Sequence, residues 1–386
     1  MASASLQERA AALTPPMGRT LLRAWLPVLV LGGLTLLLHF VVGPALGPYY
    51  SKLLMDIGIN VILAVSLNIV NGFTGQFSIG HAGFMAVGGY TAGMVTYYGG
   101  MALWGTSLPQ GGFLGPGELL FALSCVLGGL VAAGLGYVVG LPSLRLRGDY
   151  LALVTLGFGE IVRVLVQQTD DVLFSADEMA AVPWWTLPTK VGGALGFTGL
   201  PFYTSLFWVY LFVSLTLLVA YRLKASSHGR AYLSVREDEI AAEAMGIPTT
   251  RIKVRAFVLA AAFAGIAGAL FAHEVGTTLN PRELGFQKSF EAVIMVVLGG
   301  MGSISGASLA AVVITLLPEA LRSVADYRMV VYALALVVMM LVRPQGLLGL
   351  HELWELPWLR RLLRRSPGPD SSPSPDSSPG PDRGST

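Results

Sequence analysis

Charged residues are scarce in this chain of 386 residues: they make up 12% of it, and the formal net charge is only +2. Soluble domains carry roughly 25% charged residues, whereas apolar residues reach 54% here. This composition excludes an ordinary water-soluble protein, and the small net charge gives no reason to expect nucleic acid as a partner. It predicts an all-α polytopic membrane protein, because a chain surrounded by lipid must satisfy its backbone hydrogen bonds internally.

Cysteine is nearly absent as well. Cys125 is the only one in the chain, so no intrachain disulfide can form, and its apolar surroundings favour a packed thiol. No spacing typical of metal ligands is present, and we expect no cofactor. A phosphate-binding loop of the Gly-x-x-x-x-Gly-Lys-Ser/Thr type is also missing, so any ATP must be hydrolysed by another chain. The five histidines are scattered, which disfavours an intramembrane enzyme.

Long apolar runs predict about eight to ten transmembrane helices. The first run has about the length of a bilayer span, longer than the apolar region of a cleaved signal peptide, so we expect a retained helix. The predicted spans are Trp25–Leu46, Leu53–Val70, His81–Tyr98, Leu119–Leu141, Tyr150–Gln167, Pro201–Tyr221, Arg255–His273, Ser303–Leu321 and Tyr327–Val342. The stretch Phe290–Leu298 is too short to cross unaided, and it is either a broken half-helix or part of an irregular span.

The distribution of basic residues orients the bundle. They gather in the segment 1–24, between the fourth and fifth spans, in the segment Arg222–Val254 and after the last span. We expect all of these segments and both termini to be cytoplasmic, and the acidic loop Thr169–Leu200 to lie outside. Residues 25–347 would form the membrane domain. The segment 348–386 is basic and then rich in Pro and Ser, which predicts a disordered cytoplasmic tail.

Two glycine-rich breaks interrupt apolar stretches, at Asn71–His81 and at Leu298–Gly306. Non-helical backbone at membrane depth must be buried in protein or line a water-filled cavity. Paired breaks in two corresponding halves indicate a substrate site, although glycines that only let helices pack closely are the alternative. We predict a translocation path along the following residues: Gly72, Gly75, Gln76, Ser78, Gly80, His81, Gly299, Gly300, Gly302, Ser303 and Ser305.

Ionisable residues within the predicted spans are candidates for function. His81 either caps freed backbone or contacts the substrate. Glu160 and Arg163 should pair across one helical turn, and Asp56 and Asn60 should face the bundle interior. The helices after the two breaks present amino-terminal ends, which would favour a passing substrate carboxylate.

The longest charged segment, Arg222–Val254, predicts a short amphipathic helix from Arg230 to Gly246 that can dock into a groove on a partner. An interfacial helix on lipid headgroups is the alternative, but the mixture of acidic with basic residues argues against it. Read at helical period, Arg236, Glu239 and Glu243 share one stripe, beside an apolar stripe of Leu233, Ile240 and Ala244. The residues expected to carry the contact are Gly229, Arg230, Arg236, Glu239, Glu243 and Gly246.

Several strings in this chain resemble those of one transporter family. Glu243-Ala244-Met245-Gly246 is similar to the Glu-Ala-Ala…Gly loop by which ABC importer permeases contact their ATPases. The strings Gly72–Phe84, Gly192–Pro201, Gly229–Ile247, Val297–Ser303 and Arg343–Leu347 occur in the order typical of branched-chain amino-acid ABC permeases. The resemblance is greatest to the LivM-type subunit. Urea and short-chain amide permeases are similar throughout, so these cargoes remain alternatives.

The resemblance implies a multi-pass permease of the bacterial inner membrane that catalyses no reaction itself. Its partners would be a second homologous permease subunit, two cytoplasmic ATPase subunits and a periplasmic substrate-binding protein. An ion-coupled secondary transporter is a further possibility, but it would need a buried charge relay and no ATPase-docking helix. The stretch Asp170–Pro188 and the proline-rich tail depart from the family pattern.

Overall fold

The computed structural model describes residues 31–144, 150–275 and 278–322, together with part of 327–353. These residues are almost entirely helical, with one short antiparallel pair of strands, β1 (Phe197–Thr198) and β2 (Thr278–Leu279). The all-α prediction is confirmed. The predicted segment 1–24, half of the span Tyr327–Val342 and nearly all of the tail 348–386 lie outside the described residues.

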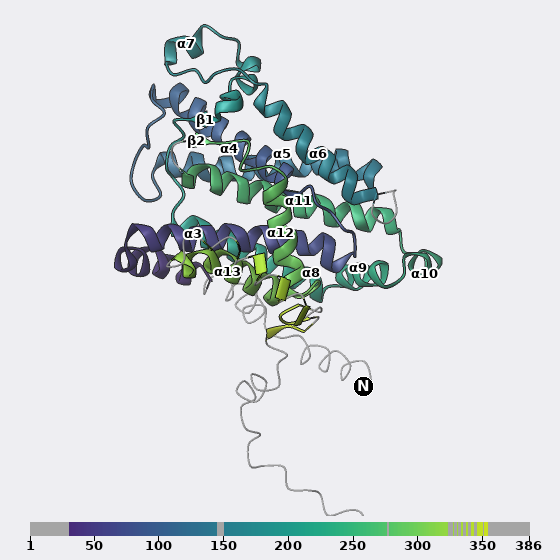
Figure 1. Ribbon diagram of the computed structural model, residues 1–386. Coiled ribbons are helices and arrows are strands. Elements are labelled where there is room, and N and C mark those ends of the chain that lie inside the picture. The colour runs from purple at the N-terminus through teal and green to yellow at the C-terminus, as the bar shows by residue number, and fades with distance from the viewer. Residues whose placement is uncertain are drawn as a thin grey trace, which may run out of the picture.

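Within the described residues, five helices are long and apolar enough to cross a membrane. They are Leu31–Phe73, which contains η1 (Leu38–Val42), α3 (Gly43–Asn68) and η2 (Ile69–Phe73), and then α5 (Pro116–Ser143), α6 (Tyr150–Gln167), α8 (Leu206–Ala225) and α11 (Thr249–Val275). Beside them run α4 (His81–Trp104) and the shorter apolar α13 (Ile304–Ala320). In Figure 1 these helices lie roughly side by side, and α12 (Phe286–Gly299) crosses between them.

The stretch Leu31–Phe73 is divided by a sharp break at Gly47, which has φ 79° and ψ 170° and is followed by Pro48. A positive φ favours glycine, and proline disrupts the helical hydrogen bonds that would bridge the break. The break falls between the predicted spans Trp25–Leu46 and Leu53–Val70. The helix is therefore broken at the predicted boundary between these two spans.

Helices α4, α5 and α11 pack by direct approach of their backbones. A Cβ atom added to Gly88 would lie 2.1 Å from the carbonyl oxygen of Gly265, and one added to Gly128 would lie 2.7 Å from that of Gly88. Small residues allow such approach between membrane helices. Close packing is thus the role of these helix-interior glycines.

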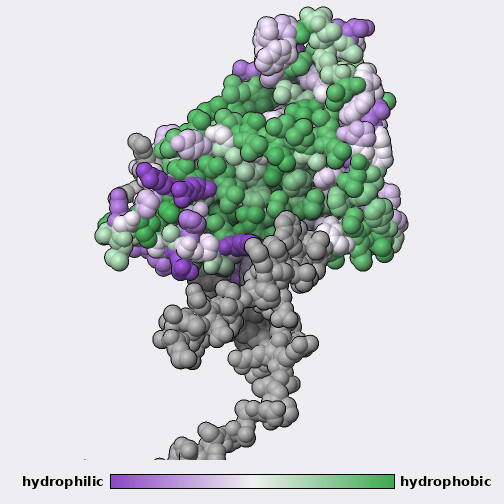
Figure 2. Space-filling model, turned by 180° about the vertical axis from the view of Figure 1, so that it is seen from behind, coloured by the Kyte–Doolittle hydropathy of each residue, from purple (hydrophilic) through white to green (hydrophobic). Residues whose placement is uncertain are grey.

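The two ends of the bundle differ. The helices α9 (Ser227–Glu237) and α10 (Glu239–Ala244) lie at one end, whereas α7 (Ala176–Ala180), η3 (Trp184–Thr189), η4 (Gly193–Leu195) and the strand pair lie at the other (Figure 1). Between these ends the surface is largely apolar (Figure 2). Leu130 of α5 and Leu153 of α6 are examples, with exposures of 62% and 64%. Such a surface suits lipid or another membrane protein.

Candidate functional site

The two glycine breaks lie against each other and are joined by the side chain of Asn68. Its Oδ1 accepts a hydrogen bond from the backbone N–H of Gly302 at 2.8 Å, and its Nδ2 donates one to the carbonyl oxygen of Ser303 at 3.0 Å. A Cβ atom on Gly72 would lie 2.4 Å from the nitrogen of Gly302. The breaks therefore form one junction, which contains the end of α3 and the start of α13.

Glycine is required in both breaks for conformational reasons. Gly75 has φ 67° and Gly302 has φ 96°, a region that side-chain-bearing residues rarely adopt. Gly299 is fixed by close approach, because an added Cβ would lie 2.4 Å from the carbonyl oxygen of Gly306. Gly300 combines φ 106° with close approach, since its added Cβ would lie 2.4 Å from the carbonyl oxygen of Gly349. Both breaks therefore depend on backbone conformations or close approaches that a side chain would disturb.

Arg236 of α9 reaches both breaks. Its Nη1 donates to the carbonyl oxygen of Gly72 at 2.9 Å and lies 3.5 Å from that of Met301. The side-chain stem also lies against Gly75, where an added Cβ would be 3.1 Å from Cγ of Arg236. A residue predicted to contact a partner thus links the segment between α8 and α11 to the glycine junction.

The amino-terminal end of α13 carries a carboxylate of the chain itself. Glu352 is 2% exposed, and it accepts hydrogen bonds from the backbone N–H groups of Ile304 and Ser305, both at 3.0 Å. Lys224 pairs with Glu352 and also donates to the carbonyl oxygen of Gly302 at 2.8 Å. A substrate carboxylate could reach this helix end only if Glu352 left it.

The electrostatics of Glu352 favour its charged form. Burial alone would raise the pKa of this carboxyl group, but the hydrogen bonds from Lys224, Ser305 and Ile304 outweigh that effect and hold the pKa below its usual value. The unpaired N–H groups at a helix start stabilise a negative charge for the same reason. Glu352 is therefore held at the start of α13 as a carboxylate anion.

The start of α4 is also held by side chains from elsewhere in the bundle. Thr155 Oγ1 accepts from the N–H of Ile79 at 3.2 Å, and Ser289 Oγ accepts from that of Ala82 at 3.0 Å. His81 is 3% exposed and bonds through Nε2 to the hydroxyl group of Ser66 at 2.8 Å. His81 thus makes a structural contact with α3.

Most residues of the predicted path are buried within the chain. The buried ones are Gly72, Ser78, Gly80, His81, Gly299, Gly300, Gly302 and Ser303, while Gln76 and Ser305 are half-buried and Gly75 is exposed. The described residues around the breaks pack as a junction between segments. Contact of these residues with substrate stays a prediction.

The single helix predicted from Arg230 to Gly246 is wrong, because the chain breaks at Asp238. This residue has φ −155° and ψ 110°, and its carboxylate accepts from the N–H groups of Ile240 and Ala241 at 2.9 and 3.0 Å. Aspartate is a strong N-cap residue, so a second short helix, α10, starts here. The predicted stop at Gly246 is confirmed, since this residue has φ 83° and directly follows the last turn.

The break at Asp238 separates residues that were expected to share one stripe. Arg236 faces the glycine junction, whereas Glu239 pairs with the buried Lys253 of α11 at 2.6 Å. Gly229 packs against the backbone of α8, and Arg230 and Glu243 are exposed. The segment between the two membrane helices is also shorter than Arg222–Val254, because α8 continues to Ala225 and α11 begins at Thr249.

The short helix α10 and the residue after it expose two large apolar side chains. Ile240 is 68% exposed, and Met245 is 83% exposed. They lie beside the exposed Glu243, at the end of the bundle where α9 and α10 project (Figure 1). Exposed apolar groups next to a charge are typical of a surface that contacts a partner.

The predicted pairing of Glu160 with Arg163 is confirmed, but of Asp56 and Asn60 only Asn60 is buried, since the Asp56 side chain is 34% exposed. Glu160 pairs with Arg163 at 2.7 Å and also accepts from the backbone N–H of Phe286, the first residue of α12, at 3.1 Å. Asn60 is 5% exposed and bonds to Thr315 and Lys288, both at 2.9 Å. The stretch Phe290–Leu298 belongs to α12, whose 14 residues end at the second break, in agreement with the half-helix interpretation.

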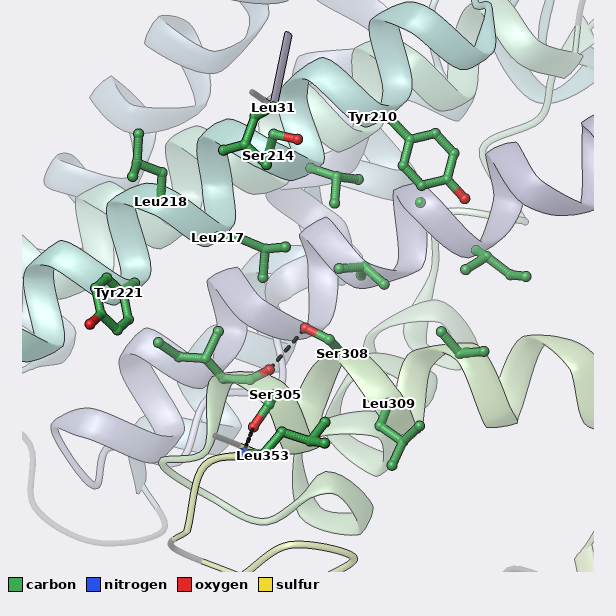
Figure 3. Close-up of a pocket in the computed structure, with 16 residues that line it drawn as sticks. Leu31, Tyr210, Ser214, Leu217, Leu218, Tyr221, Ser305, Ser308, Leu309 and Leu353 are labelled. Carbon is green, nitrogen blue, oxygen red and sulfur yellow. Dashed lines mark hydrogen bonds between the residues drawn. The ribbon is translucent and has the colours of Figure 1, made fainter. Parts of the chain in front are cut away.

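An apolar cavity of about 580 Å³ lies between α3, α8 and α13, next to the junction. Figure 3 shows Tyr210, Leu217 and Leu309 around it, and Ser305 at its edge, where the Ser305 hydroxyl accepts from the N–H of Leu353 at 2.9 Å. Its lining suits an apolar group such as an acyl chain or a hydrophobic side chain.

The model of one protein family, "Branched-chain amino acid transport system / permease component", matches residues 49–342. This chain belongs to that permease family. It is 39% identical to the high-affinity branched-chain amino acid permease LivM of Salmonella typhimurium over 306 residues, which are 75% of this chain and 68% of that protein. It is 38% identical to LivM of Escherichia coli over the same shares of the two chains.

A second kind of relative is more distant. The chain is 26% identical to the permease LivH of Escherichia coli over 295 residues, 75% of this chain and 91% of that protein. No solved structure matches the chain. The resemblance to a branched-chain amino-acid ABC permease of LivM type is thereby confirmed, and the protein is a multi-pass membrane permease.

The sequence analysis of this permease missed three residues of the junction: Asn68, Lys224 and Glu352. Asn68 is a polar residue at the end of an apolar run, which was a usable signal. Lys224 and Glu352 lie outside the glycine strings, and their contacts arise only when α8 and the segment after the last predicted span meet α13. Their position could not be deduced from spacing.

Proposed function

We propose that this permease is a membrane subunit of an ATP-driven importer of branched-chain amino acids in a bacterial inner membrane. It pairs with a second homologous permease, two ATPase subunits act on its cytoplasmic end, and a periplasmic binding protein delivers the substrate. Both termini lie in the cytoplasm. The names of the LivM relatives, which are high-affinity branched-chain amino acid transport permeases, support the cargo.

The observation that carries this proposal is the contact of Arg236 with both glycine breaks. Arg236 stands near the end of α9, next to α10 and its exposed Ile240 and Met245. An ATPase bound to α10 would displace α9 when it closes on ATP. Because the guanidinium group bonds to carbonyl oxygens of two membrane segments, that displacement would alter both at once.

The pairing between Glu239 and the buried Lys253 adds a second connection, from α10 to α11. Since α11 packs along α4 and α5 through close backbone contacts, a movement of α10 would also be passed to this part of the bundle. Closely packed helices transmit displacement because their interfaces deform little. The segment that contains α9 and α10 is thus attached to the glycine breaks through Arg236 and to α11 through Glu239.

Transport by the reconstituted complex tests the proposal. The complex contains both permeases, the ATPases and the binding protein in vesicles, and uptake of labelled leucine is followed with and without ATP. We expect ATP-dependent uptake that excess unlabelled valine or isoleucine inhibits and urea does not. Inhibition by urea alone would contradict the cargo, and uptake independent of ATP but dependent on an ion gradient would contradict the ATP-driven mechanism.

A further inference from the structure

A second cavity, of about 520 Å³, lies at the end of the bundle opposite to α9 and α10. It is formed by the first turns of α3, the start of α8 and the end of α11, together with the turn that contains His39 and Phe40. Its size is within the range of small-molecule sites, roughly 300–1,000 Å³. Unlike the cavity near the junction, it contains charged side chains.

Two buried polar atoms of this cavity have no hydrogen-bond partner among the described residues: Oε2 of Glu274 and Oγ of Ser205. The Glu274 side chain is 0% exposed, and only its Oε1 accepts a bond, from Nζ of Lys52 at 3.3 Å. Ser205 is the N-cap residue of α8, yet its hydroxyl group makes no capping bond. Buried polar groups are rarely left unsatisfied, so both atoms point to a missing ligand.

The charges around the cavity are unbalanced. Lys52 faces two carboxylates, Glu274 at 3.3 Å and Asp56 at 3.9 Å. The nearby Lys288 is paired with Glu291 at 3.1 Å and adds no net charge. Lys52 is thus the one cation that faces two carboxyl groups here, and a ligand with an ammonium group would supply a second.

We propose that this cavity binds a free α-amino acid with an apolar side chain. Glu274 Oε2 and Ser205 Oγ accept hydrogen bonds from the ligand ammonium group, and Lys52, whose side chain is 56% exposed, binds the ligand carboxylate. Phe40, Met55 and Leu206 supply apolar walls. Both charged ends of the ligand thus find partners that already line the cavity.

The location agrees with an entry site. The cavity and the Arg236 junction lie at opposite ends of α3, because Lys52 belongs to its first turns and Asn68 is its last residue. This assignment rests on the proposed function, in which substrate arrives at the end opposite to α9 and α10. Urea has no charged groups, so it could form an ion pair with neither Glu274 nor Lys52.

Kinetics of the reconstituted complex test the site. Glu274→Gln replaces a carboxylate by an amide, and Ser205→Ala removes the second acceptor. We expect each to raise the KM for leucine uptake about tenfold, as a lost hydrogen bond to a charged group does, with little change in kcat. The matched control is Asp170→Asn, which breaks an ion pair with Lys190 at the same end and should leave KM unchanged.

Protection from alkylation gives a direct measure of binding that needs no transport. Phe202 is 53% exposed and lines the cavity, so Phe202→Cys in the full complex provides a thiol there. The parent chain, whose only cysteine is the buried Cys125, gives the background. We expect leucine to slow alkylation at least about threefold at saturation, and urea not to slow it.

The outcomes separate this inference from the proposed function. Unchanged KM values together with no protection by leucine would overturn the site. Protection by leucine in a complex that imports no leucine would overturn the proposed function and support the site. Loss of protection in Phe202→Cys/Glu274→Gln would confirm that Glu274 holds the ligand.

Discussion

Nη1 of Arg236 donates a hydrogen bond of 2.9 Å to the carbonyl oxygen of Gly72. The two residues come from α9 and from the irregular stretch after α3, and the same nitrogen lies 3.5 Å from the carbonyl oxygen of Met301 in the other break. Hydrogen bonds from a charged donor contribute roughly 1.5–3 kcal/mol. One side chain near the surface can therefore hold two membrane segments in a defined arrangement.

Asn68→Ala should weaken the junction between the breaks. The change removes both side-chain hydrogen bonds and leaves the N–H of Gly302 and the carbonyl oxygen of Ser303 buried without this partner. We expect a loss of about 2–4 kcal/mol of stability, since each such group costs roughly 1–3 kcal/mol. Thermal unfolding of the purified permease measures it. Asn280→Ala, at an exposed turn, is the control, and equal melting temperatures of the two variants would contradict the role of Asn68.

Gly302→Ala should be destabilising because of its backbone conformation. With φ 96°, an alanine at this position is strained by about 1–3 kcal/mol. Gly157→Ala is the matched control, since an added Cβ there meets nothing within 4 Å and its φ is not positive. Uptake and assembly of the two variants are compared. Normal uptake by Gly302→Ala would show that the break tolerates a side chain.

Met245→Asp should prevent binding of the ATPase subunits. The change places a charge on the most exposed apolar side chain next to α10, and Glu243→Lys, which reverses the neighbouring charge, should act in the same direction. Copurification of the ATPases with the tagged permease is the readout. Leu195→Asp introduces a charge at an equally exposed position at the other end, where the exposure is 78%, and should leave copurification intact. If both Met245→Asp and Glu243→Lys retained the ATPases, this surface would not be the ATPase-binding site.

Docking of Glu352 on α13 should depend on pH. Because the pKa of Glu352 is lowered in the folded protein, its contribution is complete above the usual pKa of 4.5 and is lost as the pH falls through the lowered value. We expect the wild type to be more stable than Glu352→Gln at neutral pH, and the difference to disappear in the acid range. Thermal unfolding of both proteins against pH measures this. A difference that persists unchanged in acid would contradict the charged contact.

Hydropathy and backbone chemistry account for what the sequence could predict. The spans that became α5, α6 and α13 were located to within three residues, because these helices coincide with apolar runs. The breaks were found because glycine alone accepts the conformation of Gly75 and Gly302. Long-range contacts were out of reach: neither the meeting of Asn68 with Ser303 nor that of Glu352 with Ser305 leaves a local pattern.

The error at Asp238 has a local cause. The prediction followed helical periodicity across this residue and took no account of the strong tendency of aspartate to cap a helix. The structure starts α10 there, so Arg236 is free to face the glycine junction while Glu239 faces Lys253. Arg236 and Glu239, which were expected to share one stripe, therefore make separate contacts.

The number of leucine molecules imported per ATP hydrolysed tests the role of Arg236 most directly. It is measured in the reconstituted complex for the wild type, for Arg236→Ala and for Arg251→Ala, an exposed arginine at the start of α11. We predict that Arg236→Ala still binds the ATPases and hydrolyses ATP, but that its ratio falls about tenfold or more, as loss of a charged hydrogen bond implies, while Arg251→Ala keeps the wild-type ratio. A wild-type ratio in Arg236→Ala would contradict coupling through the contact between Arg236 and the two glycine breaks.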